Sequence, residues 1–93
     1  CRSILDVWYG GNVGEKYNVG GECEMTNLEL VKLIIKIMNA SEDLIEYVDD
    51  RPGHDLRYSI NNAKINKSVS FKPKYNINNG MQKTIEWYEC HRN

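Results

Sequence analysis

Two glycine pairs and two prolines divide this 93-residue chain into short segments and so limit what it can fold into. The pairs are Gly10-Gly11 and Gly20-Gly21, and the prolines are Pro52 and Pro73. Glycine and proline are the strongest local breaks of helices and strands. Segments of this length accommodate ordinary helices but only short strands, which cannot build a large sheet. We therefore expect an α/β fold with about four helices and short strands.

The clearest helical pattern runs from Asn27 to Met38. Thr26 and Glu29 form a capping box ahead of an apolar stripe, and Asn39 ends the pattern. Three further helices are expected before Gly10, from Asn61 or Asn62 to about Val69, and from Asn76 or Ile77 onward, where Ile77, Met81, Ile85 and Tyr88 form a stripe. Alternating or extended patterns predict short strands at residues 15–19, 44–48 and 57–60.

Charge and cysteine content exclude several classes of partner. The formal net charge is −1, whereas nucleic-acid and membrane surfaces are bound through a basic excess, so we expect neither partner. The longest apolar run, residues 33–38, is interrupted by Lys36, so no transmembrane helix is expected. Cys1, Cys23 and Cys90 lie too far apart for a metal site and indicate reduced thiols in a cytoplasmic protein.

The chain starts at Cys1, without a start methionine or a secretory signal. We therefore expect it to be part of a longer protein. A chain of this length supports one small core, so we also expect one compact unit.

Segment 50–58 is the most informative stretch for function. It places two arginines, a histidine, acidic residues and a tyrosine around a Pro52-Gly53 turn. The planar guanidinium of Arg51 matches the oxygens of a phosphate group, and His54 adds a donor for a phosphate or a sugar hydroxyl. The alternative is a surface loop held together by pairs of arginine and aspartate.

A second candidate segment runs from Gly20 to Asn27 and ends at a helix N-terminus. Free backbone N–H groups and the helix dipole favour anions there, and Asn27 could hold a phosphate or a base edge. The alternative is that Thr26 and Glu29 only cap the helix.

The familiar catalytic motifs are absent from the sequence. There is no Gly-x-x-Gly-x-x-Gly, no Tyr-x-x-x-Lys, no Walker A loop, no nucleophile elbow and no metal-binding pair of histidines. We therefore expect no catalytic residue and no metal site within these residues.

Three motifs carry a resemblance to a known family: residues 15–21, 24–29 and 50–58. In order and spacing they resemble the C-terminal part of the dTDP-glucose 4,6-dehydratases, which are extended short-chain dehydrogenases/reductases. The match continues through residues 64–65, 71–73, 80 and 83–88 and so covers nearly the whole chain. The Arg-Pro-Gly-His-Asp-x-Arg-Tyr run is its most specific part.

The resemblance implies that residues 1–93 are the small C-terminal nucleotide-sugar-binding part of such an enzyme. The NAD-binding Rossmann domain and the catalytic residues would lie upstream of Cys1, so no cofactor is expected in this part and it should be inactive alone. The resemblance assigns six residues to binding the nucleotide diphosphate of dTDP-glucose: Asn27, Asp50, Arg51, Pro52, Gly53 and His54. The full-length protein is expected to be a homodimer that forms dTDP-4-keto-6-deoxyglucose.

The chain departs from the family pattern at two places. Residues 69–73 read Val-Ser-Phe-Lys-Pro where the family usually has Leu-Gly-Trp-Lys-Pro, and Asn61 replaces an aspartate. Both look structural, as a core aromatic and a helix cap. Two alternative functions stay open: another nucleotide-sugar epimerase or dehydratase, and a non-catalytic nucleotide-sugar-binding or interaction module.

Overall fold

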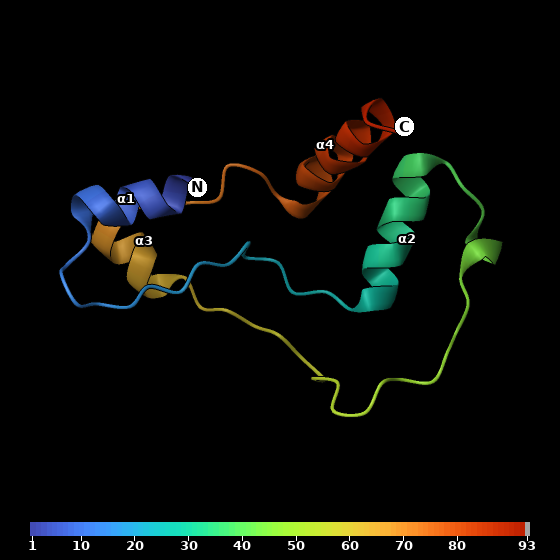
Figure 1. The fold of residues 1–93 in the computed structure, drawn as a ribbon, viewed down its shortest axis with the longest axis horizontal. Coiled ribbons are helices and arrows are strands. Elements are labelled where there is room, and N and C mark those ends of the chain that lie inside the picture. The colour runs from blue at the N-terminus through green and yellow to red at the C-terminus, as the bar shows by residue number, and fades with distance from the viewer. Residues whose placement is uncertain (93) are drawn as a thin grey trace. The chain divides into compact units, whose positions relative to one another are not determined.

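The computed structural model describes residues 1–92, and this part of the chain contains four α-helices and one short 3₁₀-helix (Figure 1). The elements are α1 (Arg2–Gly10), α2 (Asn27–Met38), η1 (Glu42–Leu44), α3 (Ala63–Val69) and α4 (Ile77–Cys90). The four helices predicted from the sequence are confirmed. None of the described helices is long and apolar enough to cross a membrane.

Two compact units divide the chain, and each combines two separate stretches of sequence. The first unit comprises residues 1–23 and 59–76, and the second comprises residues 24–58 and the segment that begins at Ile77. The expectation of one compact unit is therefore wrong. Very little surface is buried: among residues 1–92 only Asn62, Ile65 and Phe71 are buried. A core this small does not extend through the whole chain.

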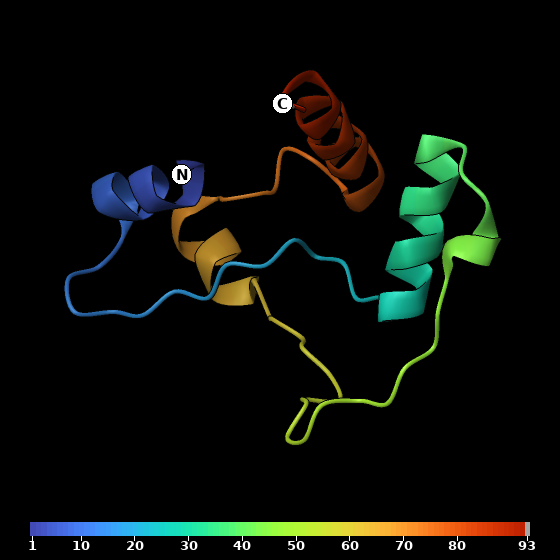
Figure 2. The same cartoon turned by 45° about the vertical axis from the view of Figure 1, so that its right-hand side comes forward.

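The first unit is built on the packing of α1 against α3, which lie side by side in both views (Figure 1 and Figure 2). Ile65 of α3 is fully buried, and Phe71, two residues after the end of this helix, is 8% exposed. The Arg2 guanidinium lies 5.9 Å from the centre of the Phe71 ring and donates a hydrogen bond of 3.0 Å to the Lys72 carbonyl. Phe71 is thus a core aromatic, as predicted.

The start of α3 uses two neighbouring asparagines for different purposes. The Asn61 side chain, one residue before the N-cap position, accepts a hydrogen bond of 2.8 Å from the N–H of Ala63, the first residue of the helix. The Asn62 side chain instead accepts from the Gly20 N–H and donates to the Gly20 carbonyl, both at 2.7 Å. Gly20 also approaches closely: a Cβ there would lie 3.0 Å from the Ile60 side chain.

The second unit contains α2 and α4, which contact each other. The predicted capping box is present, because Thr26 accepts from the Glu29 N–H at 3.1 Å while Glu29 accepts from the Thr26 N–H at 2.6 Å. Asn39 ends the helix in the left-handed conformation, with φ of 50°. The apolar stripe of α4 is half-buried along most of its length, but its last member, Tyr88, is 64% exposed.

The three segments predicted as strands form no strand within residues 1–92. Leu44 belongs to η1, and residues 45–50, 15–19 and 57–60 have no regular secondary structure. A strand exists only where a neighbouring strand pairs with its N–H and C=O groups. The described residues supply no such neighbour. We expected an α/β fold with short strands, but residues 1–92 form helices and no sheet.

Candidate functional site

A concave site of about 580 Å³ lies within the second unit, between the segment that leads into α2 and the loop of residues 50–58. Its lining comprises residues 24–27, Glu29, Asp50 and residues 54–58. This volume is typical of pockets for small molecules and cofactors. Both candidate segments of the sequence analysis therefore contribute to one cavity.

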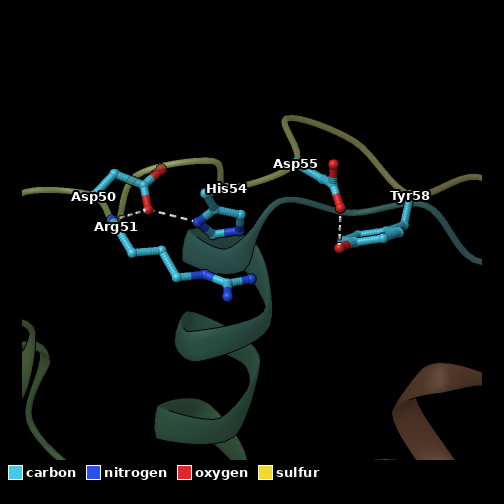
Figure 3. A network of polar contacts seen from close by, with 5 residues as sticks. All are labelled: Asp50, Arg51, His54, Asp55 and Tyr58. Atoms are coloured by element: carbon cyan, nitrogen blue, oxygen red, sulfur yellow. Dashed lines mark hydrogen bonds and ion pairs between the residues drawn. The ribbon is translucent and has the colours of Figure 1, made fainter.

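Asp50 organises the first half of the loop (Figure 3). Its Oδ1 atom accepts a hydrogen bond of 2.8 Å from the Arg51 N–H and lies 2.5 Å from His54 Nδ1. The chain turns between them at Pro52-Gly53, where Gly53 adopts φ of 74°, a conformation that favours glycine. The hydrogen bond to His54 is the main cause that lowers the pKa of Asp50 from its ordinary value. The contact fixes His54 through Nδ1 and leaves the Nε2 edge of the ring for a ligand.

The second half of the loop is closed by Asp55 and Tyr58. The Tyr58 hydroxyl donates a hydrogen bond to the Asp55 carboxylate (Figure 3). Because the hydroxyl donates to an anion, this bond raises the pKa of Tyr58. Sequence reasoning did not assign Tyr58 to the site, although it lies at the end of the most specific motif.

An ion pair connects the loop to the segment before α2. Arg57 Nη2 donates a hydrogen bond of 2.8 Å to Glu24 Oε2, and Arg57 Nε donates to Oε1 of the same carboxylate. The hydrogen bond to Glu24 is the main cause that raises the pKa of Arg57. Neither residue was assigned from the sequence. The only signal was that each belongs to one of the two motifs that form the site.

The structure separates the six predicted site residues into two groups. Asn27, Asp50 and His54 line the cavity, whereas Arg51, Pro52 and Gly53 do not. The Arg51 side chain extends away from the Asp50 carboxylate (Figure 3). Pro52 and Gly53 therefore shape the turn. Arg51 does not line the cavity, but it is the sequence neighbour of Asp50, which does.

Four carboxylates line the cavity, which by themselves would repel an anionic ligand. Each has a partner of its own: Glu24 binds Arg57, Glu29 closes the capping box, Asp50 contacts His54 and Asp55 accepts from Tyr58. These partners reduce the repulsion. The donors available to a ligand are then the Asn27 amide and the backbone at the start of α2. Because Nδ1–H of His54 points to Asp50, the second nitrogen of His54 donates only when the imidazole is doubly protonated.

No group of three or more His, Cys, Asp and Glu side chains that could hold a metal occurs among residues 1–92. The donors that line the cavity fit the binding of a polar or anionic small molecule.

The comparisons with known proteins agree in one assignment, although no family model matches the chain. A dTDP-glucose 4,6-dehydratase from Streptomyces niveus is 45% identical over 92 residues, which is 99% of this chain and 27% of that protein. The crystal structure of a dTDP-glucose 4,6-dehydratase from Bacillus anthracis in complex with NAD is 44% identical, with a TM-score of 0.91. The match covers 98% of this chain and 29% of the Bacillus anthracis chain.

A second solved structure, a dTDP-glucose 4,6-dehydratase from Streptomyces venezuelae with NAD and TYD bound, is 38% identical with a TM-score of 0.92. It is matched over 99% of this chain and 29% of its own. The chain thus spans a little over a quarter of the length of the relatives it matches. In sequence and fold, the chain is a relative of the dTDP-glucose 4,6-dehydratases and corresponds to a segment of those enzymes.

Proposed function

We propose that this chain is the nucleotide-sugar-binding part of a dTDP-glucose 4,6-dehydratase and that the cavity of its second unit holds the nucleotide diphosphate of dTDP-glucose. One observation carries the proposal. Asn27 from one motif and Asp50 and His54 from another converge on a single cavity of about 580 Å³. Two motifs far apart in sequence would have no reason to meet in a cavity if they served only as a helix cap and a surface loop.

The proposed division of roles follows from the chemistry of each side chain. Asn27 donates a neutral hydrogen bond to a phosphate oxygen at the N-terminus of α2, where backbone N–H groups also favour an anion. His54, oriented by Asp50, donates to the diphosphate through its other nitrogen in the doubly protonated imidazolium form, because Asp50 takes the hydrogen bond from Nδ1. Arg51 supplies a guanidinium that Asp50 does not hold, and this guanidinium turns toward the diphosphate when the ligand binds. Pro52 and Gly53 keep Arg51 and His54 on one turn.

NAD and the catalytic residues belong, in this proposal, to residues outside the 93 of this chain. The complete reaction oxidises C4 of the glucosyl unit, eliminates water across C5–C6 and returns the hydride to C6, which regenerates NAD. The two relatives solved with NAD support this assignment. The three segments predicted as strands, residues 15–19, 44–48 and 57–60, would then pair with strands supplied by the rest of the enzyme.

Two further properties are part of the proposal. The natural protein acts in the cytoplasm, which agrees with three cysteines that are free and exposed. It is a homodimer, which agrees with large apolar side chains left exposed on this chain, such as Trp8 and Trp87.

The test is an assay of the natural protein that carries residues 1–93. Incubation with NAD and dTDP-glucose should yield dTDP-4-keto-6-deoxyglucose, and UDP-glucose and GDP-mannose should be turned over far more slowly. Equal turnover of UDP-glucose would favour a sister enzyme. No turnover of any nucleotide sugar, together with retained binding of dTDP, would favour a non-catalytic binding module.

A further inference from the structure

The Glu24–Arg57 ion pair spans the two segments that line the cavity. Both hydrogen bonds run between the same guanidinium and the same carboxylate, so the contact is bidentate. The partners are 33 residues apart in sequence, and both line the cavity. A bidentate arginine–carboxylate contact fixes the relative orientation of its two side chains as well as their distance.

Three other polar contacts around the cavity are local, namely the capping box, the Asp50–His54 contact and the Asp55–Tyr58 hydrogen bond. The capping box joins Thr26 to Glu29 three residues later, and the Asp50–His54 contact spans four residues. The cavity has two walls, the segment that leads into α2 and the loop of residues 50–58, and each of these contacts lies within one wall. Glu24 lies just before the helix start that carries Asn27, and Arg57 lies just after His54. The ion pair between them thus joins the two walls directly.

This contact contributes little to the stability of the fold, because both partners are largely exposed. The side chains of Arg57 and Glu24 are 67% and 50% exposed, and ion pairs in such positions contribute about 0–1 kcal/mol. The ion pair can matter more for the affinity of a ligand that touches both walls. If the walls are mobile before binding, the entropy lost in ordering them weakens the binding, whereas walls already held in place avoid this loss.

We propose that the Glu24–Arg57 pair is a positioning clamp that holds Asn27 and His54 at the separation required by one diphosphate. The inference rests on the proposed function, because it takes dTDP as the ligand of the cavity. Arg57 acts in it through Glu24 and not as a ligand of the phosphates. This distinguishes Arg57 from Arg51, which lies within the same motif.

The test measures the affinity of dTDP by calorimetry in the natural protein and in the variants Glu24→Gln, Arg57→Gln and the exchange Glu24→Arg/Arg57→Glu. A clamp predicts that each single variant binds dTDP about fivefold more weakly, the upper end for an exposed pair, and that the exchange recovers most of the loss. If Arg57 instead bound the phosphates directly, Glu24→Gln would release it and strengthen binding, and the exchange would abolish binding. Either of these results would overturn the inference.

A kinetic measurement separates positioning from a general effect on folding. The single variants should raise the KM for dTDP-glucose and leave kcat within about twofold, as expected when binding is lost equally in the ground and transition states. Their melting temperatures and NAD affinities should remain those of the wild type. The matched control is Glu15→Gln, which breaks a similarly exposed ion pair with Lys64 in the first unit and should leave dTDP affinity unchanged.

The outcomes also separate this inference from the proposed function. A wild-type protein that does not bind dTDP would overturn both. A wild-type protein that binds dTDP, with unchanged affinity in Glu24→Gln, would overturn the clamp alone.

Discussion

The side chain of Asn62 and the backbone of Gly20 exchange two hydrogen bonds, each of 2.7 Å, across 42 residues of sequence. Asn62 is only 5% exposed, so both bonds form largely out of water. They join the segment before Gly21 to the start of α3. An amide is the side chain that can donate and accept at once in this geometry.

Replacement of Asn62 by alanine should therefore destabilise the first unit strongly. The change leaves a backbone donor and a backbone acceptor of Gly20 without partners, and each unsatisfied buried group costs about 1–3 kcal/mol. We expect a loss of about 2–4 kcal/mol in the free energy of unfolding, measured by urea denaturation. The control is Asn61→Ala, which removes an exposed hydrogen bond to the Ala63 N–H and should cost about 1 kcal/mol. Equal losses in the two variants would contradict the assigned role of Asn62.

Substitution of Arg51 should affect ligand binding and leave the fold intact. Loss of a charge-assisted contact with a diphosphate costs about 2–3 kcal/mol, so Arg51→Ala should weaken dTDP binding about thirty- to hundredfold. Arg51→Lys should recover only part, because a point charge does not reproduce the guanidinium fork. Calorimetry on the natural protein checks both values. A dTDP affinity within twofold of the wild type in Arg51→Ala would mean that the loop is only structural.

Asn27→Ala should weaken dTDP binding less than Arg51→Ala does. Its hydrogen bond is neutral and contributes about 1 kcal/mol, so the expected loss of dTDP affinity is about fivefold. NAD affinity should be unchanged in the Asn27 and Arg51 variants, because the cofactor is proposed to bind outside this chain. A parallel loss of NAD binding would indicate a disturbed fold.

Acid should destabilise the chain through carboxylates that the fold holds ionised. Hydrogen bonds from Thr26 lower the pKa of Glu29, and a hydrogen bond from Lys64 lowers that of Glu15, both from an ordinary value of 4.5. The folded chain then binds protons less readily than the unfolded chain. The stabilisation is therefore complete above the unfolded pKa and is lost as pH falls through the folded pKa.

Urea denaturation at a series of pH values measures this effect. We expect constant stability between about pH 7 and pH 5 and a decline below about pH 4.5. Glu29→Gln keeps the hydrogen bonds of the capping box but does not titrate, so the decline should be shallower. Glu46→Gln, at an exposed position of the same unit, is the control. Identical pH profiles for wild type and Glu29→Gln would show that the capping carboxylate contributes nothing to the acid response.

The isolated polypeptide of residues 1–93 should associate with itself. Trp8, Leu44 and Trp87 are 81%, 73% and 56% exposed, and apolar surface of this kind drives association. Sedimentation velocity should show species larger than a monomer at micromolar concentration, and the same sample should form no product from dTDP-glucose and NAD. A monodisperse monomer with a sharp transition at high temperature, or any product formed, would contradict the expectation.

The helices could be predicted from the sequence because their signals are local. The capping box of Thr26 and Glu29 and the left-handed Asn39 define both ends of α2 within a few residues of chain. The apolar stripe that begins at Ile77 likewise predicted the start of α4 correctly. Such signals depend on neighbours three or four residues away, which any fragment contains. The motif of residues 50–58 also stood out in the sequence, but its composition left open a surface loop, and only the family resemblance assigned it to binding.

Contacts between distant residues were decided only by the tertiary structure. Strand patterns at residues 15–19 and 57–60 carry no information about whether a pairing partner is present, so the predicted strands did not form here. Asn61 and Asn62 were equivalent candidates for a helix cap, and only the position of Gly20 made Asn62 a buried bridge. Glu24 and Arg57 belong to separate motifs, and nothing in either motif specifies the other. Their pairing depends on how the chain returns after 33 residues, because local sequence determines which side chains a segment carries and the packed fold determines which of them meet.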